Sequence, residues 1–130
     1  MIEIKFRVFD VDSSEMLFTD SDNNYRDWFF EFQGGFLKLF TPEEDDFAEE
    51  REAVFMQYTG FEDAGGIELY VDDIIEEDGK FYIIEWDESM GMFQCTNIHS
   101  LDNIALHEFD GVNTVWHQGN KHENPELLTT

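Results

Sequence analysis

The sequence predicts a mainly β protein of the α+β kind with little helix, built as a small sheet or barrel. Short segments of alternating apolar and polar residues recur along the 130-residue chain, and turn-forming residues separate them. Many short strands at close spacing are typical of small sheets and barrels. Hydrophobic residues make up 42% of the chain and aromatic residues 16%, which is enough for a real core at this length. We therefore expect a folded chain of one domain, or one small domain with an appendage.

The first two strands are expected near the amino terminus. Residues 2–9 alternate between apolar and polar side chains, which is the period of a strand with one buried face. A turn at Ser13-Ser14 precedes Met16, Leu17 and Phe18, which we expect to form a short second strand.

A β-hairpin is expected around Gly34-Gly35, because two glycines supply the positive φ angles of a tight primed turn. Residues 28–33 and 36–40 would be its strands. Residues 41–52 then become sharply acidic, with Pro42 near the start, and we expect a loop with some helix there.

The second half of the chain predicts further strands and turns. Residues 53–58 should form a strand that ends at Thr59-Gly60, and a turn should follow at residues 62–66. Residues 69–75 and 80–86 are expected to pair across Asp78-Gly79, which is a strong hairpin signal. The remaining expected elements are strands at 92–96 and 114–118, a loop between them, and one helical turn within 123–128.

The net charge is the most unusual property of the chain. Seven Lys and Arg residues stand against 31 Asp and Glu residues, which gives a formal charge of −24 and a pI near 4.1. The residues up to 65 contain 17 acidic and 5 basic residues, and the rest contain 14 and 2, so each half carries −12. The acidity is therefore a property of the folded surface and not of a tail, and direct binding to nucleic acid or to anionic lipid is not expected.

Two acidic clusters are the candidate contact sites for a basic protein partner. Spread evenly, the net charge would be a poor imitation of a nucleic acid, whereas clustering on one face would reach a comparable density. A merely acidic, highly soluble protein is the alternative. The candidate partner-binding residues are Glu43, Glu44, Asp45, Asp46, Glu49, Glu50, Asp72, Asp73, Glu76 and Glu77.

A run of aromatic residues in the predicted hairpin is the candidate contact for self-association. Phe29 and Phe30 fall on opposite faces of their strand, so one face can supply an apolar contact to another subunit or to a partner. The candidate oligomer-contact residues are Trp28, Phe29 and Phe30.

No pattern predicts catalysis, a cofactor or a metal. Paired carboxylates are too abundant to identify an acid and base, and a phosphate loop, a His-Glu-x-x-His run and a nucleophile elbow are all missing from the sequence. Asp20, Asp22, Asn24 and Glu31 match part of a calcium loop, but Tyr25 occupies the position of its turn glycine, and an acidic loop is the alternative. Cys95 is interpreted as a buried small hydrophobe, and the four histidines as surface or packing residues.

Five blocks of the sequence resemble the YopX family of phage and prophage proteins. The blocks are residues 4–10, 55–63, 68–74, 85–87 and 119–128. The resemblance implies an SH3-like β-barrel from about residue 60 onward, with an amino-terminal portion (1–59) beside it, and it implies self-association. Two departures are Asp72-Asp73, where the family usually has Gly-Asp, and the acidic insert at 43–52.

Charge and resemblance together predict a phage-encoded binding protein in the cytoplasm of a bacterial host. We expect it to inhibit a nucleic-acid-binding or defence enzyme, such as a restriction enzyme or an RNA-guided nuclease, by occupying the basic surface of that enzyme as a nucleic-acid mimic. The alternative is a self-assembling phage accessory protein that acts through apolar contacts. An enzyme is the third hypothesis and has the least support.

Overall fold

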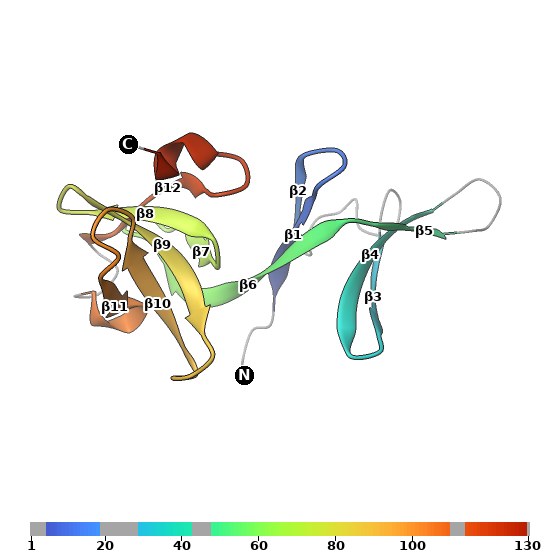
Figure 1. The fold of residues 1–130 in the computed structure, drawn as a ribbon, viewed down its shortest axis with the longest axis horizontal. Coiled ribbons are helices and arrows are strands. Elements are labelled where there is room, and N and C mark those ends of the chain that lie inside the picture. Colours follow the sequence, from blue (N-terminus) through green and yellow to red (C-terminus); the bar gives the residue numbers. More distant parts are fainter. Residues whose placement is uncertain (1–4, 19–28, 43–47, 110–113, 130) are drawn as a thin grey trace. The chain divides into compact units, whose positions relative to one another are not determined.

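The computed structural model describes residues 5–18, 29–42, 48–109 and 114–129, and it shows a protein made almost entirely of short β-strands (Figure 1). For residues 29, 30, 32, 33, 41, 42, 48 and 49 it describes the backbone alone. The chain divides into two compact units, Ile4–Met56 and Gln57–Thr130. We call the second the barrel unit. The sequence placed the boundary at 59/60, whereas the structure places it three residues earlier, within a strand.

The first unit begins with the expected pair of strands. Strand β1, Phe6–Asp10, is antiparallel to β2, Glu15–Phe18, with Val8 opposite Leu17. The turn between them places Ser14 at a φ of 58°. Both strands are confirmed in the described part of the chain, and residues 2–4 of the expected first strand lie outside it.

The hairpin is confirmed. Strands β3, Phe29–Gln33, and β4, Phe36–Pro42, are antiparallel, and Gln33 pairs with Phe36. The two glycines between them have φ angles of 60° and 86°. Positive φ at both central residues is the geometry that a primed turn requires, and glycine adopts it without steric cost.

The acidic segment after the hairpin differs from the expectation of a loop with some helix. Residues 48–51 form strand β5, Ala48–Arg51, which pairs with the end of β4 so that Phe40 lies opposite Glu50. Alanine and glutamate have little intrinsic strand preference, so the available edge of β4 overrides local propensity here.

The core of the first unit uses both faces of β1, which alternation did not predict. Val8 is fully buried and packs with Leu39, and Phe6 and Phe55 lie against them with ring centroids 5.8 Å apart. Arg7 was expected on the solvent face, but it is only 4% exposed, and its Nε donates to Met56 Sδ at 3.4 Å. The face of β1 that carries Arg7 and Phe9 is therefore buried as well.

Strand β6, Ala53–Glu62, is longer than expected because a glycine bends it instead of ending it. In the four-stranded sheet, whose spatial order is β2-β1-β6-β7, it lies between β1 and β7, Glu68–Tyr70. The register with β7 shifts between Tyr58 and Glu62, and Gly60 within that interval has a φ of 86°. The residue that was expected to terminate the strand instead produces an irregularity within it.

The barrel unit contains a five-stranded antiparallel sheet that curls into a half-barrel (Figure 1). Its strand order is β11-β10-β9-β8-β12. The strands are β8 Asp73–Glu77, β9 Lys80–Asp87, β10 Met92–Asn97, β11 Asn103–Ala105 and β12 Trp116–Asn120. Short 3-10 helices span Leu106–Glu108 and Pro125–Leu128.

Most elements of the barrel unit match their predictions, with two exceptions. The β8–β9 hairpin turns at Asp78-Gly79 with φ angles of 52° and 78°. The strand expected at 69–75 is broken into β7 and β8 at Val71-Asp72, and β11 occupies part of an expected loop. The curved sheet encloses a core of seven buried residues, namely Leu69, Ile75, Ile84, Cys95, Leu106, Phe109 and Val115.

Candidate functional site

The first predicted acidic cluster is mostly beyond the part of the chain that the structure describes. Residues 43–46 are outside it, and for Glu49 only the backbone, in β5, is described. Glu50 is exposed on the same strand and its Oε1 lies 3.3 Å from Lys38 Nζ. Trp28 and the side chains of Phe29 and Phe30 are also outside the described part, as are Asp20, Asp22 and Asn24 of the partial calcium match, whereas Glu31 is exposed on β3.

The second predicted cluster divides into an inward pair and an outward pair. Asp73 is fully buried, and Asp72 is 9% exposed, so neither is a surface contact residue. Glu76 and Glu77 are half-buried on β8, and Glu76 Oε1 accepts a hydrogen bond of 2.8 Å from Gly79 N–H. The adjacent aspartates are therefore a structural feature, which corrects their assignment to a partner-binding surface.

The surface of the barrel unit is nonetheless strongly acidic. Residues 57–130 contain 16 acidic and 2 basic residues. Three of the acidic residues, Asp63, Asp72 and Asp73, are buried. The half-buried or exposed ones within the described residues, which we call the barrel carboxylates, are Glu62, Glu68, Glu76, Glu77, Asp78, Glu85, Asp87, Glu88, Asp102, Glu108, Glu123 and Glu126.

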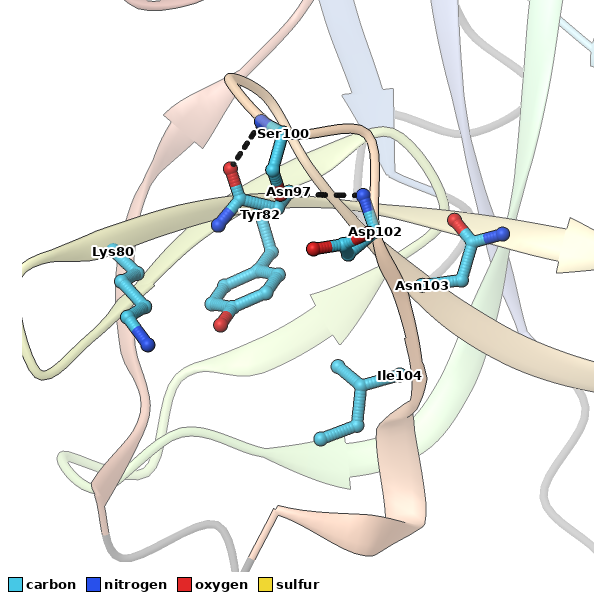
Figure 2. Close-up of a pocket in the computed structure, with 7 residues that line it drawn as sticks. All are labelled: Lys80, Tyr82, Asn97, Ser100, Asp102, Asn103 and Ile104. Atoms are coloured by element: carbon cyan, nitrogen blue, oxygen red, sulfur yellow. Dashed lines mark hydrogen bonds between the residues drawn. The ribbon is translucent and has the colours of Figure 1, made fainter.

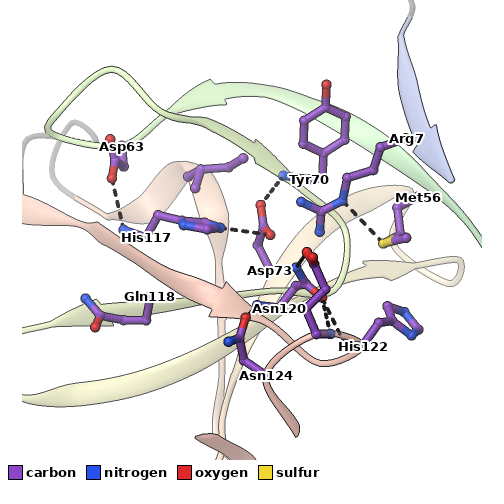
Figure 3. A network of polar contacts seen from close by, with 12 residues as sticks. Arg7, Met56, Asp63, Tyr70, Asp73, His117, Gln118, Asn120, His122 and Asn124 are labelled. Carbon is purple, nitrogen blue, oxygen red and sulfur yellow. Dashed lines mark hydrogen bonds and ion pairs between the residues drawn. The ribbon is translucent and has the colours of Figure 1, made fainter. Parts of the chain in front are cut away.

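The buried Asp73 joins three parts of the barrel unit (Figure 3). Its Oδ2 accepts a hydrogen bond of 2.7 Å from Tyr70 N–H, and its Oδ1 lies 3.1 Å from His117 Nε2. A carboxylate accepts, so His117 donates from Nε2. The contact links β8 to its neighbour β12 and to the end of β7, and hydrogen bonding offsets the cost of burying the carboxyl group.

Asp63 holds the turn before β7 and the start of β12 together. Its Oδ1 accepts from Gly65 and Ile67 N–H at 2.9 and 2.8 Å, and its Oδ2 accepts from His117 N–H at 2.9 Å. Burial alone would raise the pKa of Asp63, but these backbone donors and the nearby His117 outweigh it and hold the pKa below the ordinary 3.8. Asp63 therefore serves as an ionised anchor for three backbone groups.

Asp72 occupies a backbone conformation that favours glycine. Its φ is 75°, in the left-handed region that residues other than glycine rarely adopt. Its carboxylate lies 2.9 Å from His122 Nε2 and 3.6 Å from Lys121 Nζ, both on the segment after β12. These side-chain contacts favour aspartate at a strained position and place one of the two lysines of the barrel unit beside a buried carboxylate.

The loop after β12 is fixed by Asn120 and by Gly119. Asn120 Oδ1 accepts from His122 and Glu123 N–H at 3.0 and 2.8 Å, and its Nδ2 donates to Glu123 Oε1 at 2.8 Å. Gly119 has a φ of 155°, and a Cβ built there would lie 2.5 Å from Asn124 Oδ1. A side chain at position 119 therefore has no room unless the Asn124 side chain, or the loop that carries it, moves.

The sequence analysis did not single out this polar network. His117 and His122 looked like scattered histidines, because their aspartate partners are 44 and 50 residues away along the chain. The resemblance to the YopX family implies glycine at position 72, and this was the available signal, since such a glycine indicates a special φ.

The described residues offer little for catalysis or metal binding. No group of three or more His, Cys, Asp and Glu side chains within them is arranged to hold a metal ion. Cys95 is fully buried, as expected, and burial together with the charge of Glu85 raises the pKa of its thiol to about 12. A thiol of that kind is a poor nucleophile.

Two open cavities lie on the barrel unit. The first, of about 340 Å³, is polar at its rim and is lined by Lys80, Tyr82, Asn97, Ser100, Asp102, Asn103 and Ile104 (Figure 2). Asn97 Oδ1 accepts from Ser100 N–H at 3.1 Å, so this residue shapes the loop that borders the cavity. The second, of about 360 Å³, is more aromatic. No helix in the described ranges combines the length and apolar character needed to cross a bilayer.

The architecture defines a class of small, mainly β proteins with a half-barrel and an appended hairpin unit. A comparison with solved structures finds a likeness to the crystal structure of protein EF1440 from Enterococcus faecalis, with a TM-score of 0.61 and 24% identity over 98% of this chain and 99% of that one. At that identity the likeness shows the fold alone. A comparison with curated proteins gives no match.

The family follows from the sequence match. The family model described as YopX protein matches residues 5–129, which is nearly the whole chain. The chain therefore belongs to the YopX family, and the resemblance seen in its five sequence blocks is confirmed.

Proposed function

We propose that this protein is an acidic binding protein that occupies the basic, nucleic-acid-contacting surface of a host or defence enzyme and thereby inhibits it. One observation carries the proposal, namely that twelve barrel carboxylates face solvent wholly or partly where the same unit has two lysines. A negative potential of this kind attracts surfaces rich in Lys and Arg and speeds their encounter. Nucleic acid would compete for the same surfaces.

The way Asp63 is held supports the proposal. Backbone N–H groups stabilise this buried carboxylate, so its burial brings no lysine or arginine onto the barrel unit. The resemblance to phage and prophage proteins supports a host target, and the restriction enzymes and RNA-guided nucleases that defend bacteria bind nucleic acid. Binding, without a reaction of its own, is the role we propose.

The test is a pull-down from bacterial host lysate, followed by competition with duplex DNA and with RNA. The affinity for the captured partner should fall at least about tenfold between about 50 mM and 200 mM salt, because the interface consists largely of screened ion pairs. Either nucleic acid should displace the partner. If neither added salt nor nucleic acid changes the affinity for the captured partner, the hypothesis of nucleic-acid mimicry is refuted.

Two matched variants give opposite expectations. Replacing Glu76, Glu77, Glu85 and Glu88 by glutamine removes four charges from exposed or half-buried positions and should weaken capture. Lys80→Gln removes an exposed positive charge and should strengthen it. Each exposed change should alter the free energy of unfolding by no more than about 0.5 kcal/mol, so urea denaturation serves as the folding control.

A second candidate function, self-assembly through apolar contacts, rests on Phe36. This side chain is 72% exposed at the start of β4, directly after the Gly34-Gly35 turn. Added salt should strengthen such assembly by screening the charge of −24 per chain, and Phe36→Ser should abolish it. Light scattering that reports a monomer at every salt and protein concentration would exclude this candidate.

A further inference from the structure

An aromatic groove on the barrel unit differs in character from the acidic surface around it. The groove has a volume of about 360 Å³ and is lined by Gln57, Phe61, Trp86, Gly91, Met92, Phe93, Leu106 and His107. Five of these eight residues have large apolar side chains. A concave apolar lining is typical of a site that takes a side chain from a binding partner.

The walls of the groove are held in place by the barrel core. Phe61 and Phe93 pack against the buried core cluster, and Leu106 belongs to it. Trp86 lies opposite Phe93 in the β9–β10 register, with ring centroids 4.9 Å apart and an angle of 66° between the rings. Trp86 is nevertheless 45% exposed, so a fixed aromatic surface faces solvent. Binding there would need little further ordering of the protein.

The groove lies on a strongly acidic unit, which carries twelve barrel carboxylates and two lysines, and neither lysine is among the residues that line the groove. Asp87, at the end of β9, accepts hydrogen bonds from Ser89 and Met90 N–H, in the turn that leads to the lining residues Gly91 and Met92. A hydrogen bond from the Ser89 hydroxyl, together with the N–H groups of Ser89 and Met90, holds the pKa of Asp87 below its ordinary value against the opposing effect of burial. Asp87 is therefore ionised at neutral pH.

We infer that the groove binds a segment of the basic partner that inserts one apolar side chain against Trp86 and Met92 and flanks it with Lys or Arg. Charge complementarity selects this occupant, because an uncharged or acidic apolar segment would leave the nearby carboxylates without a matching charge. The inference rests on the proposed function and adds an apolar anchor to it. The anchor gives specificity that charge alone lacks, since a buried central contact usually dominates an interface.

Two synthetic peptides of equal charge test the anchor. One has a phenylalanine between two lysine–arginine pairs, and the other has serine in its place. Fluorescence anisotropy of the labelled peptides should show the phenylalanine peptide binding at least about tenfold more tightly, because it removes a large apolar side chain from water. Both affinities should fall with added salt.

Variants locate the contact. Trp86→Ala and Met92→Gln should each reduce the affinity of the phenylalanine peptide toward that of the serine peptide. Trp116→Ala is the matched control, because Trp116 is also a half-exposed strand tryptophan, at 49%, but does not line the groove. Met92→Gln keeps the side-chain length, so the test survives even if Trp86→Ala unfolds the barrel.

The outcomes separate the two proposals. If both peptides bind equally and with steep salt dependence, the proposed apolar contact in the groove is wrong and the proposed acidic binding function still holds. Failure of both peptides to bind at low salt would overturn both. If the phenylalanine peptide binds the Trp86→Ala and Met92→Gln variants as tightly as the wild type, the proposed contact in the groove is also wrong.

Discussion

Two buried carboxylates, Asp10 in the first unit and Asp63 in the barrel unit, are held in different ways. Asp10 is 6% exposed and accepts a hydrogen bond of 3.0 Å from Arg51 Nη2, so a positive side chain neutralises it. Asp63 accepts hydrogen bonds from the backbone N–H groups of Gly65, Ile67 and His117. Backbone groups, which carry no formal charge, hold this second carboxylate.

Asp63 shows how a carboxylate can be buried without a lysine or arginine to neutralise it. Backbone donors can hold a carboxylate in its ionised form without cancelling its charge, whereas an arginine cancels it. A protein that binds basic surfaces benefits from backbone donors, because each lysine or arginine added to the surface weakens its negative potential. The predictions below test how far each unit depends on its buried carboxylates.

The largest effect is expected for Asp73→Ala. The variant removes the acceptor of Tyr70 N–H and of His117 inside a fully buried site, so we expect a loss of about 3 kcal/mol in the free energy of unfolding. Urea denaturation measures it. In the first unit, Asp10→Ala should cost less, about 1–2 kcal/mol, because Arg51 is partly exposed and water can replace the lost contact. Equal losses for the two variants would contradict the comparison.

Gly119→Ala should have the next largest effect. The new Cβ would lie 2.5 Å from Asn124 Oδ1 and 2.8 Å from Asn124 Cγ, so the Asn124 side chain must leave its contact with Asn120 N–H or the loop must shift. We expect a loss of about 2 kcal/mol, measured by urea denaturation.

A second substitution separates the steric effect at position 119 from backbone strain. Adding Asn124→Ala to Gly119→Ala removes the clashing atoms beyond Cβ, and part of the lost stability should return relative to Asn124→Ala alone. As a control, Gly66→Ala changes a glycine with a φ of 87° and no atom within 4 Å of the added Cβ, so it should show strain alone. A double variant that recovers nothing would argue against the clash.

The smallest effect concerns the pH dependence contributed by Asp63. Its pKa in the folded protein is below 3.8, so its contribution to stability is fully present above about pH 4 and is lost as the pH falls through the lower, folded value. Asp63→Asn removes this contribution. The difference in unfolding free energy between wild type and variant should therefore be constant from about pH 7 to 5 and shrink below about pH 4. A difference that stays constant down to about pH 2 would contradict the assignment.

Most strands of the fold could be predicted because their signals are local. The glycine pair at 34–35 and Asp78-Gly79 both form the expected tight turns, since positive φ is a property of the residues that adopt it. Strand β5 could not be predicted, because its alanine and glutamates pair with the edge of β4 against their own preference. Gly60 could not be assigned either, because a glycine after a strand can end it or bend it.

The candidate site was predictable in composition but not in geometry. The excess of carboxylates is visible in the sequence, and so is the aromatic content. The inward orientation of Asp73 is not visible, because its partner His117 comes from a strand 44 residues later. Trp86 shows the same limit, since its exposure in a groove depends on the positions of Phe61, Met92 and Leu106.

The amino-acid sequence was sufficient to establish a mainly β fold, a very acidic chain and membership of the YopX family, because composition, period-two alternation and ordered sequence blocks are properties of the chain itself. Folding established which carboxylates are buried anchors and which face solvent, and it assembled the groove around Trp86. The physical reason is that burial and hydrogen bonding depend on residues brought together from distant strands. Asp72 and Glu76 lie four residues apart in the sequence, and yet one is held by His122 inside the barrel unit and the other faces the solvent in part.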